Sequence, residues 1–207
     1  MSIVGAVHAN LVFGRRVRVL ACRLANMLPE GAKVLDVGCG DGTLDSLILR
    51  SRPDLSINGI DILVRPQTHI PVVPFDGSTI PYPDGAFDVV MFVDVLHHTE
   101  DPMVLLREAK RVARRAIVLK DHTKEGTLAG PTLRFMDWVG NSHHGVVLPY
   151  NYWTQSQWRR AMSDLGLVAT TWSSNVGLYS WPATHLFDRA LHFVAKLTTD
   201  HHDLSAA

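Results

Sequence analysis

The sequence predicts an α/β fold, a doubly wound and mostly parallel seven-stranded sheet with an antiparallel edge strand. Short apolar runs typical of buried strands alternate with helical patterns over residues 34–119, and this alternation gives parallel strands joined by right-handed crossovers. Two late strand patterns, at residues 167–172 and 191–197, have no helical pattern between them, so we expect an antiparallel hairpin at the sheet edge. The 207 residues, 46% of them hydrophobic, suffice for one domain with a sizeable core.

The composition argues against some classes of binding partner. Twenty basic and twenty acidic residues cancel, so no global field favours nucleic acid or an anionic membrane. The longest apolar run, residues 86–96, is interrupted by Asp88 and Asp94 and is too short to span a bilayer. Only Cys22 and Cys39 are present, and no signal peptide is expected at Met1. We therefore expect a cytoplasmic protein with no membrane insertion and no nucleic-acid partner.

The chain is expected to begin with an amphipathic helix. Apolar residues recur at helical spacing over residues 10–28, and three arginines lie away from that stripe. This predicts a helical cap, residues 1–30, that packs on the sheet or over a ligand cleft. The alternative is binding to a membrane surface through the arginines.

A strand, a tight turn and a helix start follow. The largely apolar residues 34–37 run directly into Gly38, Gly40 and Gly42, and a helical pattern begins at Leu44. Glycine accepts positive φ and lets a ligand approach the backbone, while the amides of a first helical turn attract an anionic group. This turn predicts a site for a small ligand with an anionic tail.

The remaining elements follow in order within a main domain expected at residues 31–200. The second strand ends at Asp61, the third at Asp76, and a fourth, fully buried strand precedes Asp94. Asp101 and Pro102 begin a helix, and Thr154 with Gln157 forms a capping-box pattern that begins another. The expected ranges are residues 55–61, 70–75, 87–93 and 116–119 for strands, 102–113 and 155–165 for helices, 121–153 for a lid or insertion, and 201–207 for a tail.

In these elements the chain resembles the class I S-adenosylmethionine-dependent methyltransferases, a broad group that includes many enzymes acting on small molecules. Residues 34–42, which read VLDVGCGDG, look like the first motif of that family. Asp61 looks like its ribose-binding acid, Phe75-Asp76-Gly77 like its adenine motif, and residues 81–90 like its approach to the fourth strand. The resemblance implies the Rossmann-like methyltransferase fold and S-adenosylmethionine as cofactor.

The chemistry of these residues agrees with the resemblance. The Asp61 carboxylate can accept hydrogen bonds from both ribose hydroxyls, and Ile62 could pack against the adenine face. Asp76 can accept from the adenine amino group, where Gly77 leaves room for the ring, although an Asp-Gly pair alone is more often a plain turn. The complete set of predicted cofactor-binding residues is Asp36, Gly38, Cys39, Gly40, Asp61, Ile62, Asp76, Gly77, Val93 and Asp94.

A nicotinamide dinucleotide is the competing ligand for such a turn. Its fingerprint needs glycine at the first, third and sixth places, which are Gly38, Gly40 and Thr43 here, so the last place fails. Asp36 and Asp41 would also place negative charge near a pyrophosphate, whereas a sulfonium and an ammonium tolerate it. The turn therefore favours S-adenosylmethionine.

The methyl acceptor must lie beside the sulfonium, where ligand clefts open at the carboxyl ends of the strands. Asp94, His97 and His98 follow the fourth strand, and Asp121 and His122 follow the fifth. Neutral imidazole suits general-base work near neutral pH, so we predict a catalytic set of His98, His122 and Asp121, with Asp94 or Asp121 orienting the base. The alternative is that the histidine pair only closes the cofactor pocket through backbone contacts.

A metal site is a second alternative at this edge. Asp94, Asp121, His122, His143 and His144 all carry oxygen or imidazole ligands that could converge. Metal-dependent catechol methyltransferases, however, carry an Asp-Asn pair where this chain has Asp121-His122. We therefore expect no resident metal.

The sequence thus predicts transfer of a methyl group from S-adenosylmethionine to a small-molecule acceptor by in-line displacement. The chain has no Asp/Asn-Pro-Pro-Tyr run and no Pro-Cys nucleophile, the signatures of many nitrogen and cytosine-carbon methyltransferases. Aromatic residues crowd residues 121–153 and suggest a pocket for a partly apolar acceptor, unless they serve only to pack a lid. The alternative from another class is a non-catalytic S-adenosylmethionine-binding regulatory or partner protein.

Overall fold

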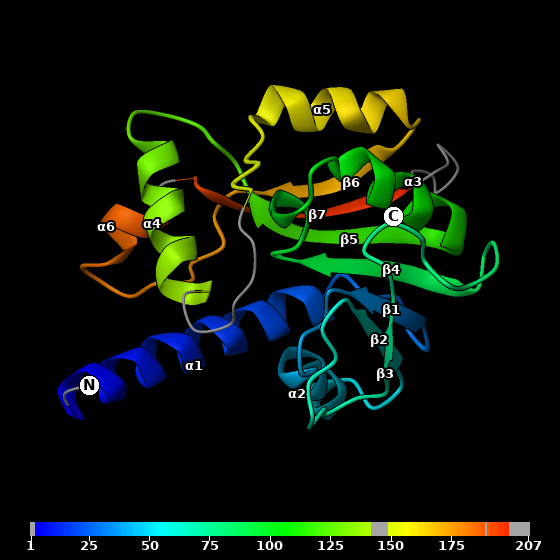
Figure 1. Cartoon of the computed structure of the whole chain (residues 1–207), viewed down its shortest axis with the longest axis horizontal. Coiled ribbons are helices and arrows are strands. Elements are labelled where there is room, and N and C mark those ends of the chain that lie inside the picture. The colour runs from blue at the N-terminus through cyan, green and yellow to red at the C-terminus, as the bar shows by residue number, and fades with distance from the viewer. Residues whose placement is uncertain (1–2, 142–148, 189, 199–207) are drawn as a thin grey trace.

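The computed structural model describes residues 3–141, 149–188 and 190–198, and it contains a seven-stranded sheet in the order β3-β2-β1-β4-β5-β7-β6 (Figure 1). β1 to β5 run parallel, and β7 is antiparallel to both β5 and β6. This confirms the predicted fold class, with the antiparallel strand one place in from the edge. The strands are β1 (Lys33–Val37), β2 (Ser56–Asp61), β3 (Val72–Pro74), β4 (Phe87–Val93), β5 (Ala113–His122), β6 (Val168–Ser173) and β7 (His192–Thr198).

Helices cover both faces of the sheet (Figure 1). One face packs on α1 (Ile3–Ala25) and α2 (Thr43–Ser51) and the other on α3 (Pro102–Val112) and α5 (Gln155–Asp164), which gives two apolar cores. Three further elements are the 3-10 helix η1 (Leu96–His98), α4 (Ala129–Asn141) and α6 (Thr184–Phe187). In Figure 1, α4 and α6 lie at the end of the sheet towards which the arrows of β4 and β5 point.

The helix starts predicted from capping residues are confirmed. The Asp101 side chain accepts a hydrogen bond from the Met103 backbone N–H, and Pro102 occupies the first helical position of α3. Thr154 and Gln157 form the reciprocal capping box of α5. These local signals act over three or four residues, so they can be read from the sequence.

The structure corrects other boundaries. α1 begins at Ile3 and ends at Ala25, whereas the sequence pattern placed it at residues 10–28. β5 runs to His122, because β7 pairs with it as far as the His122–His192 pair. Asp121 and His122 therefore lie inside a strand, and the predicted insertion at residues 121–153 begins too early.

Two helices were missed. α4 lies inside the predicted insertion, where Gly130 and Pro131 weaken the local helical signal. Burial of Ala129 and Leu133 against Tyr152 and Leu191 holds α4 in place instead. The short α6 lies between β6 and β7, where no helical pattern was recognised. His143, His144 and the predicted tail at residues 201–207 lie outside the described residues, and the division into a cap, a main domain and a tail stays a prediction.

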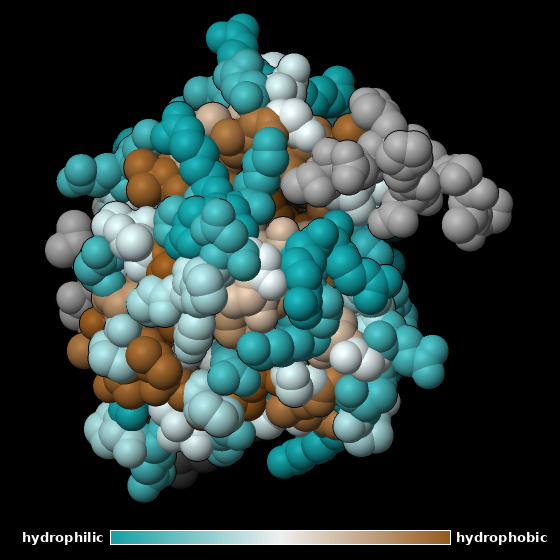
Figure 2. Space-filling view, turned by 90° about the vertical axis from the view of Figure 1, so that its right-hand side faces the viewer, coloured by the Kyte–Doolittle hydropathy of each residue, from teal (hydrophilic) through white to brown (hydrophobic). Residues whose placement is uncertain are grey.

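No helix in the described ranges is both long and apolar enough to cross a membrane. Figure 2 shows the molecule from the side opposite α4 and α6, where hydrophilic side chains cover much of the surface and apolar ones appear between them.

Candidate functional site

Of the three glycines in the turn after β1, two are packed against side chains of the protein and one faces open space. All three glycines have positive φ, 77° at Gly38, 61° at Gly40 and 74° at Gly42. A Cβ at Gly38 would lie 2.6 Å from Cγ2 of Val95, and one at Gly42 would lie 2.5 Å from Cγ1 of Ile70. A Cβ at Gly40 would meet no atom within 4 Å. Gly40 is therefore the glycine beside which a ligand has room.

Asp61, at the end of β2, is bound to this turn. Its Oδ2 accepts the Gly40 N–H at 2.8 Å and its Oδ1 accepts the Leu63 N–H at 2.8 Å. Ile62 is 64% exposed, and a Cβ on Gly77 would lie 3.2 Å from its Cγ2. The structure thus brings Gly40, Asp61, Ile62 and Gly77 to one edge of the sheet, as the sequence predicted.

Two other predicted residues are placed differently. Oδ1 of Asp76 accepts hydrogen bonds from the Ser78 N–H, the Ser78 hydroxyl and the Thr79 N–H. This oxygen therefore stabilises the local turn, and these three hydrogen bonds do not involve Oδ2. The thiol of Cys39 packs against Gly59 of β2, where a larger residue would clash with it. Cys39 can therefore offer a ligand its backbone rather than its sulfur.

Asp36 lies beneath the turn beside Asp45, a residue that the sequence analysis did not select. Both carboxyls are buried, and Oδ1 of Asp36 and both oxygens of Asp45 have no hydrogen bond among the described residues. Burial raises both pKa values, with the charge of Asp45 adding to the shift of Asp36, and the pKa of Asp45 rises to about 6. One proton shared between the two acids relieves this repulsion.

A buried ionic cluster lies at the carboxyl ends of β4 and β5. Asp94 has a φ of 59°; one of its oxygens pairs with Nζ of Lys120, and the other lies 2.6 Å from Nη2 of Arg16. Although burial opposes it, the two cations hold the pKa of Asp94 below its usual range. Lys120 is fully buried, and its Nζ also lies 3.3 Å from Nδ1 of His192 in β7. Val93, at the end of β4, packs in the core on the α1 side.

His97 occupies the centre of this cluster. Its Nδ1 lies 2.7 Å from Oδ1 of Asp121, and its Nε2 lies 3.3 Å from Oδ2 of Asp137 in α4. Tyr152 donates its hydroxyl hydrogen to the same Asp137 oxygen. Burial works against protonation, yet the two carboxylates raise the pKa of His97 to about 10. Asp121 also accepts the Leu96 and His122 backbone N–H groups, at 3.0 and 2.7 Å.

The two predicted bases, His98 and His122, are in different surroundings. Nδ1 of His122 lies 3.4 Å from Nδ1 of His97, 3.5 Å from Asp121 and 3.6 Å from Asp94. Burial, Lys120 and His97 lower the pKa of His122. His98 is half-buried with no hydrogen bond to its Nδ1, and burial and the charge of His97 lower its pKa to about 4. Asp121 therefore lies closest to His97, at 2.7 Å, and is 3.5 Å from Nδ1 of the predicted base His122.

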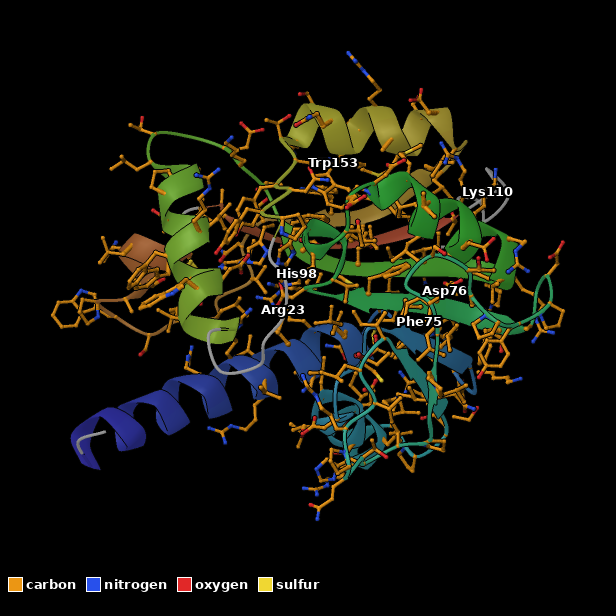
Figure 3. All side chains as sticks on the ribbon, in the orientation of Figure 1. Arg23, Phe75, Asp76, His98, Lys110 and Trp153 are labelled. Atoms are coloured by element: carbon orange, nitrogen blue, oxygen red, sulfur yellow. The ribbon has the colours of Figure 1, made fainter. Side chains whose placement is uncertain are left out.

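The cluster and the adenine-side residues occupy different parts of one edge. Figure 3 shows His98 at the end of the sheet near α4, and Phe75 and Asp76 well apart from it on the β3 side. Val95, which contacts the glycine turn, directly follows Asp94, so the turn separates the two groups. The turn therefore lies between the adenine-side residues near β2 and β3 and the ionic cluster.

The comparison with protein families decides what this ligand is. A family described as "Methyltransferase domain" matches residues 13–171. The chain belongs to the S-adenosylmethionine-dependent methyltransferase family. S-adenosylmethionine is therefore its cofactor, and the resemblance noted in the sequence is confirmed.

Individual proteins that the chain resembles share about a third of its residues over part of its length. The 27-O-demethylrifamycin SV methyltransferase of Amycolatopsis mediterranei (strain S699) is 33% identical over 110 residues, 46% of this chain and 40% of the relative. The 2-methyl-6-phytyl-1,4-hydroquinone methyltransferase of Synechocystis sp. (strain ATCC 27184 / PCC 6803 / Kazusa) is 30% identical over 147 residues, 66% and 41% of the two chains. The chain thus spans about two fifths of the length of these curated relatives.

The fold of the methyltransferase is also found in solved structures. A geranyl diphosphate methyltransferase, solved with GPP and sinefungin, superimposes with a TM-score of 0.65 at 14% identity, over 87% of this chain and 77% of that one. At this identity the likeness concerns the fold alone.

Several residues of the buried ionic cluster were not recognised in the sequence. Arg16, Lys120, Asp137, Tyr152 and His192 come from five different elements or loops, and nothing in the linear order brings them together. Lys120 alone had a usable signal, because a lysine directly before Asp121-His122 interrupts an apolar strand. A charged residue inside such a strand needs a partner.

Proposed function

We propose that this protein transfers the methyl group of S-adenosylmethionine to a small, partly apolar acceptor by in-line displacement. The supporting observation is the buried ionic cluster around Asp94, Lys120 and His97, next to the glycine turn. A dense set of buried ionisable groups at the carboxyl edge of a doubly wound sheet is typical of a reaction site.

The residues at the turn fit the cofactor. Gly40 has open space beside it, Asp61 offers a strand-end carboxylate for the ribose hydroxyls, and exposed Ile62 beside Gly77 offers an apolar surface for adenine. The other residues proposed to line the cofactor site, through their backbone or from beside the turn, are Asp36, Gly38, Cys39, Asp76, Val93 and Asp94. When bound, the cofactor supplies a methyl group that is already activated, so the protein's task is to align the acceptor.

We infer that His122 removes the acceptor proton where the acceptor must lose one. Its Nδ1 faces the carboxylates of Asp94 and Asp121, at 3.6 and 3.5 Å, which leaves Nε2 to face an acceptor. The Trp158 indole donates a hydrogen bond to the His122 carbonyl at 3.0 Å and fixes this end of β5. His98 has no comparable pairing of Nδ1 with a carboxylate.

The names of the relatives support an apolar, small acceptor. Those two proteins are named for a rifamycin and a phytyl hydroquinone, which are both small organic molecules rather than proteins or nucleic acids. In this chain, α4 presents Phe135 and Trp138, which are 55% and 59% exposed, at the end of the sheet that holds the cluster. A neutral net charge and two free thiols agree with a cytoplasmic enzyme that does not act on nucleic acid.

The proposal is tested in two stages. S-adenosylhomocysteine should raise the unfolding temperature, because a ligand at 100 times its Kd adds about 2.7 kcal/mol of stability. Methyl-labelled S-adenosylmethionine is then incubated with an organic extract of the source cells, and the label should appear in a small, extractable product. His122→Ala should abolish this labelling, whereas His69→Ala, an exposed histidine, should not.

Two outcomes contradict the proposal. Cofactor binding without labelling in any extract favours the non-catalytic regulatory protein, and label in protein or nucleic acid overturns the small-molecule acceptor. Full turnover in His122→Ala removes the base assignment.

A further inference from the structure

Three potential ligand atoms converge beside the ionic cluster. One ring nitrogen of His97, one ring nitrogen of His98 and one carboxylate oxygen of Asp137 all lie within 4.8 Å of one another. His97 and His98 come from η1 and Asp137 from α4, so the set joins the sheet edge to the helix beyond it. Two imidazole nitrogens with one carboxylate oxygen form a donor set typical of zinc.

The contact between His97 and Asp137 has the geometry of two ligands on one ion. Nε2 of His97 lies 3.3 Å from Oδ2 of Asp137 but makes no hydrogen bond to it. Two ligands held tetrahedrally at about 2.0–2.1 Å from a zinc ion lie about 3.3–3.4 Å apart.

The second imidazole has one ring nitrogen with no hydrogen-bond partner among the described residues. Nδ1 of His98 is buried and has no hydrogen bond among the described residues, and its ring centroid lies 4.0 Å from that of His97. A buried polar atom without a partner costs free energy, so such an atom needs an explanation. The half-buried side chain of His98 gives an ion a route from solvent.

The surroundings match those of bound zinc. A ligating histidine commonly hydrogen-bonds to a carboxylate through its other ring nitrogen, and Asp121 holds His97 in that way. Tyr152 fixes Asp137 through its hydroxyl.

A neighbouring set is less suitable. Asp94, His97 and His122 also converge, but the ammonium of Lys120 already pairs with Asp94 and would repel a second cation there. We propose that His97, His98 and Asp137 bind a zinc-type divalent transition metal, with three protein ligands and one position open to a further ligand. This site uses a residue set different from the one weighed in the sequence and does not depend on the identity of the methyl acceptor.

The test is direct binding to the full chain, freed of any affinity tag and stripped with a chelator. Zn²⁺ titration should give one tight equivalent at this site, and Co²⁺ should produce the visible absorption of a four-coordinate ion. His98→Ala and Asp137→Asn should each weaken Zn²⁺ binding at least tenfold. Asp121→Asn, which replaces the hydrogen-bond partner of His97 Nδ1, should weaken it by about 10–100-fold.

Matched controls separate this site from adventitious binding. His69→Ala and His185→Ala remove exposed histidines and should leave Zn²⁺ affinity unchanged. Thermal unfolding of each metal-free variant confirms that it is folded, and because His98 is half-buried, its replacement is tolerated best. Absence of a tight equivalent in the wild-type chain, or tight binding that survives His98→Ala combined with Asp137→Asn, overturns the proposal.

Discussion

Oδ2 of Asp61 lies 2.8 Å from the backbone nitrogen of Gly40, so the acid at the end of β2 holds the glycine turn of the neighbouring strand. The same carboxylate accepts the Leu63 N–H. Asp61 therefore has a structural role before any cofactor binds.

Asp61→Asn should lower both stability and cofactor affinity. The amide keeps one accepting oxygen, so one of the two backbone N–H groups loses its acceptor, at a cost of about 1 kcal/mol. We also expect S-adenosylhomocysteine affinity, measured by calorimetry, to fall at least tenfold. Asp84→Asn, whose side chain is 81% exposed, is the control. Unchanged affinity in the Asp61 variant would remove its proposed ribose contact.

Gly40→Ala and Gly31→Ala form a matched pair for the open space at the turn. Their φ values are 61° and 64°, and neither new Cβ would meet an atom within 4 Å. Each substitution should therefore cost about 1–2 kcal/mol of strain. Only Gly40→Ala should weaken S-adenosylhomocysteine binding, because its methyl group enters the proposed cofactor space. Equal affinities in the two variants would argue against a ligand beside Gly40.

The fold, and the placement of the proposed cofactor residues at one edge of the sheet, could be predicted from the sequence because their signals are local. Gly38, Gly40 and Gly42 follow a strand directly, and Asp61 lies at the end of the next one. Parallel strands bring these positions to one edge whatever the remaining chain does. The placement of β7 between β5 and the edge strand β6, by contrast, depends on pairing between residues at least 70 positions apart.

Arg16→Ala should destabilise the protein by about 1–3 kcal/mol, because it removes one of two cations on the mostly buried Asp94 carboxylate. The loss of stability is smaller than for a fully buried ion pair, because Lys120 still pairs with Asp94 and because water screens the Arg16 side chain, which is 28% exposed. Urea unfolding measures the effect. Arg15→Ala, on the exposed side of the same helix, should stay within about 0.5 kcal/mol of wild type. Equal stability of the two variants would show that the ion pair contributes nothing.

The pH dependence of stability should change in Asp45→Asn. The pKa of Asp45 is about 6 in the folded chain, against 3.8 ordinarily, so the folded state binds the proton more tightly. Stability from this group is present at low pH and is lost as the pH rises from about 4 to 6. Asp45→Asn should therefore gain about 1–3 kcal/mol relative to wild type above pH 6 and little at pH 4.

Denaturant unfolding at the two pH values checks this difference. Glu30→Gln, an exposed acid, should show no such dependence. A constant difference between Asp45→Asn and wild type across the range would mean that Asp45 does not carry the shared proton.

The acceptor side could be predicted only in part. The sequence placed Asp94, His97, His98, Asp121 and His122 near one another, but it could not say which imidazole would face Asp121. That choice is made by the 3-10 turn of η1, whose three residues carry no period long enough to read. Asp137 was missed for another reason, since α4 is held by burial of Leu133 rather than by its own helical propensity.

The position of β7 has a consequence for the nascent chain on the ribosome. His192 begins β7 and contacts Lys120 at 3.3 Å, and β7 lies between β5 and β6. Until residues 192–198 have left the ribosome, β5 presents an unpaired edge, and the buried lysine lacks one of its neighbours. The ionic cluster around Lys120 is therefore complete only after β7 has emerged, and until then the β5 edge is open to pairing with other strands.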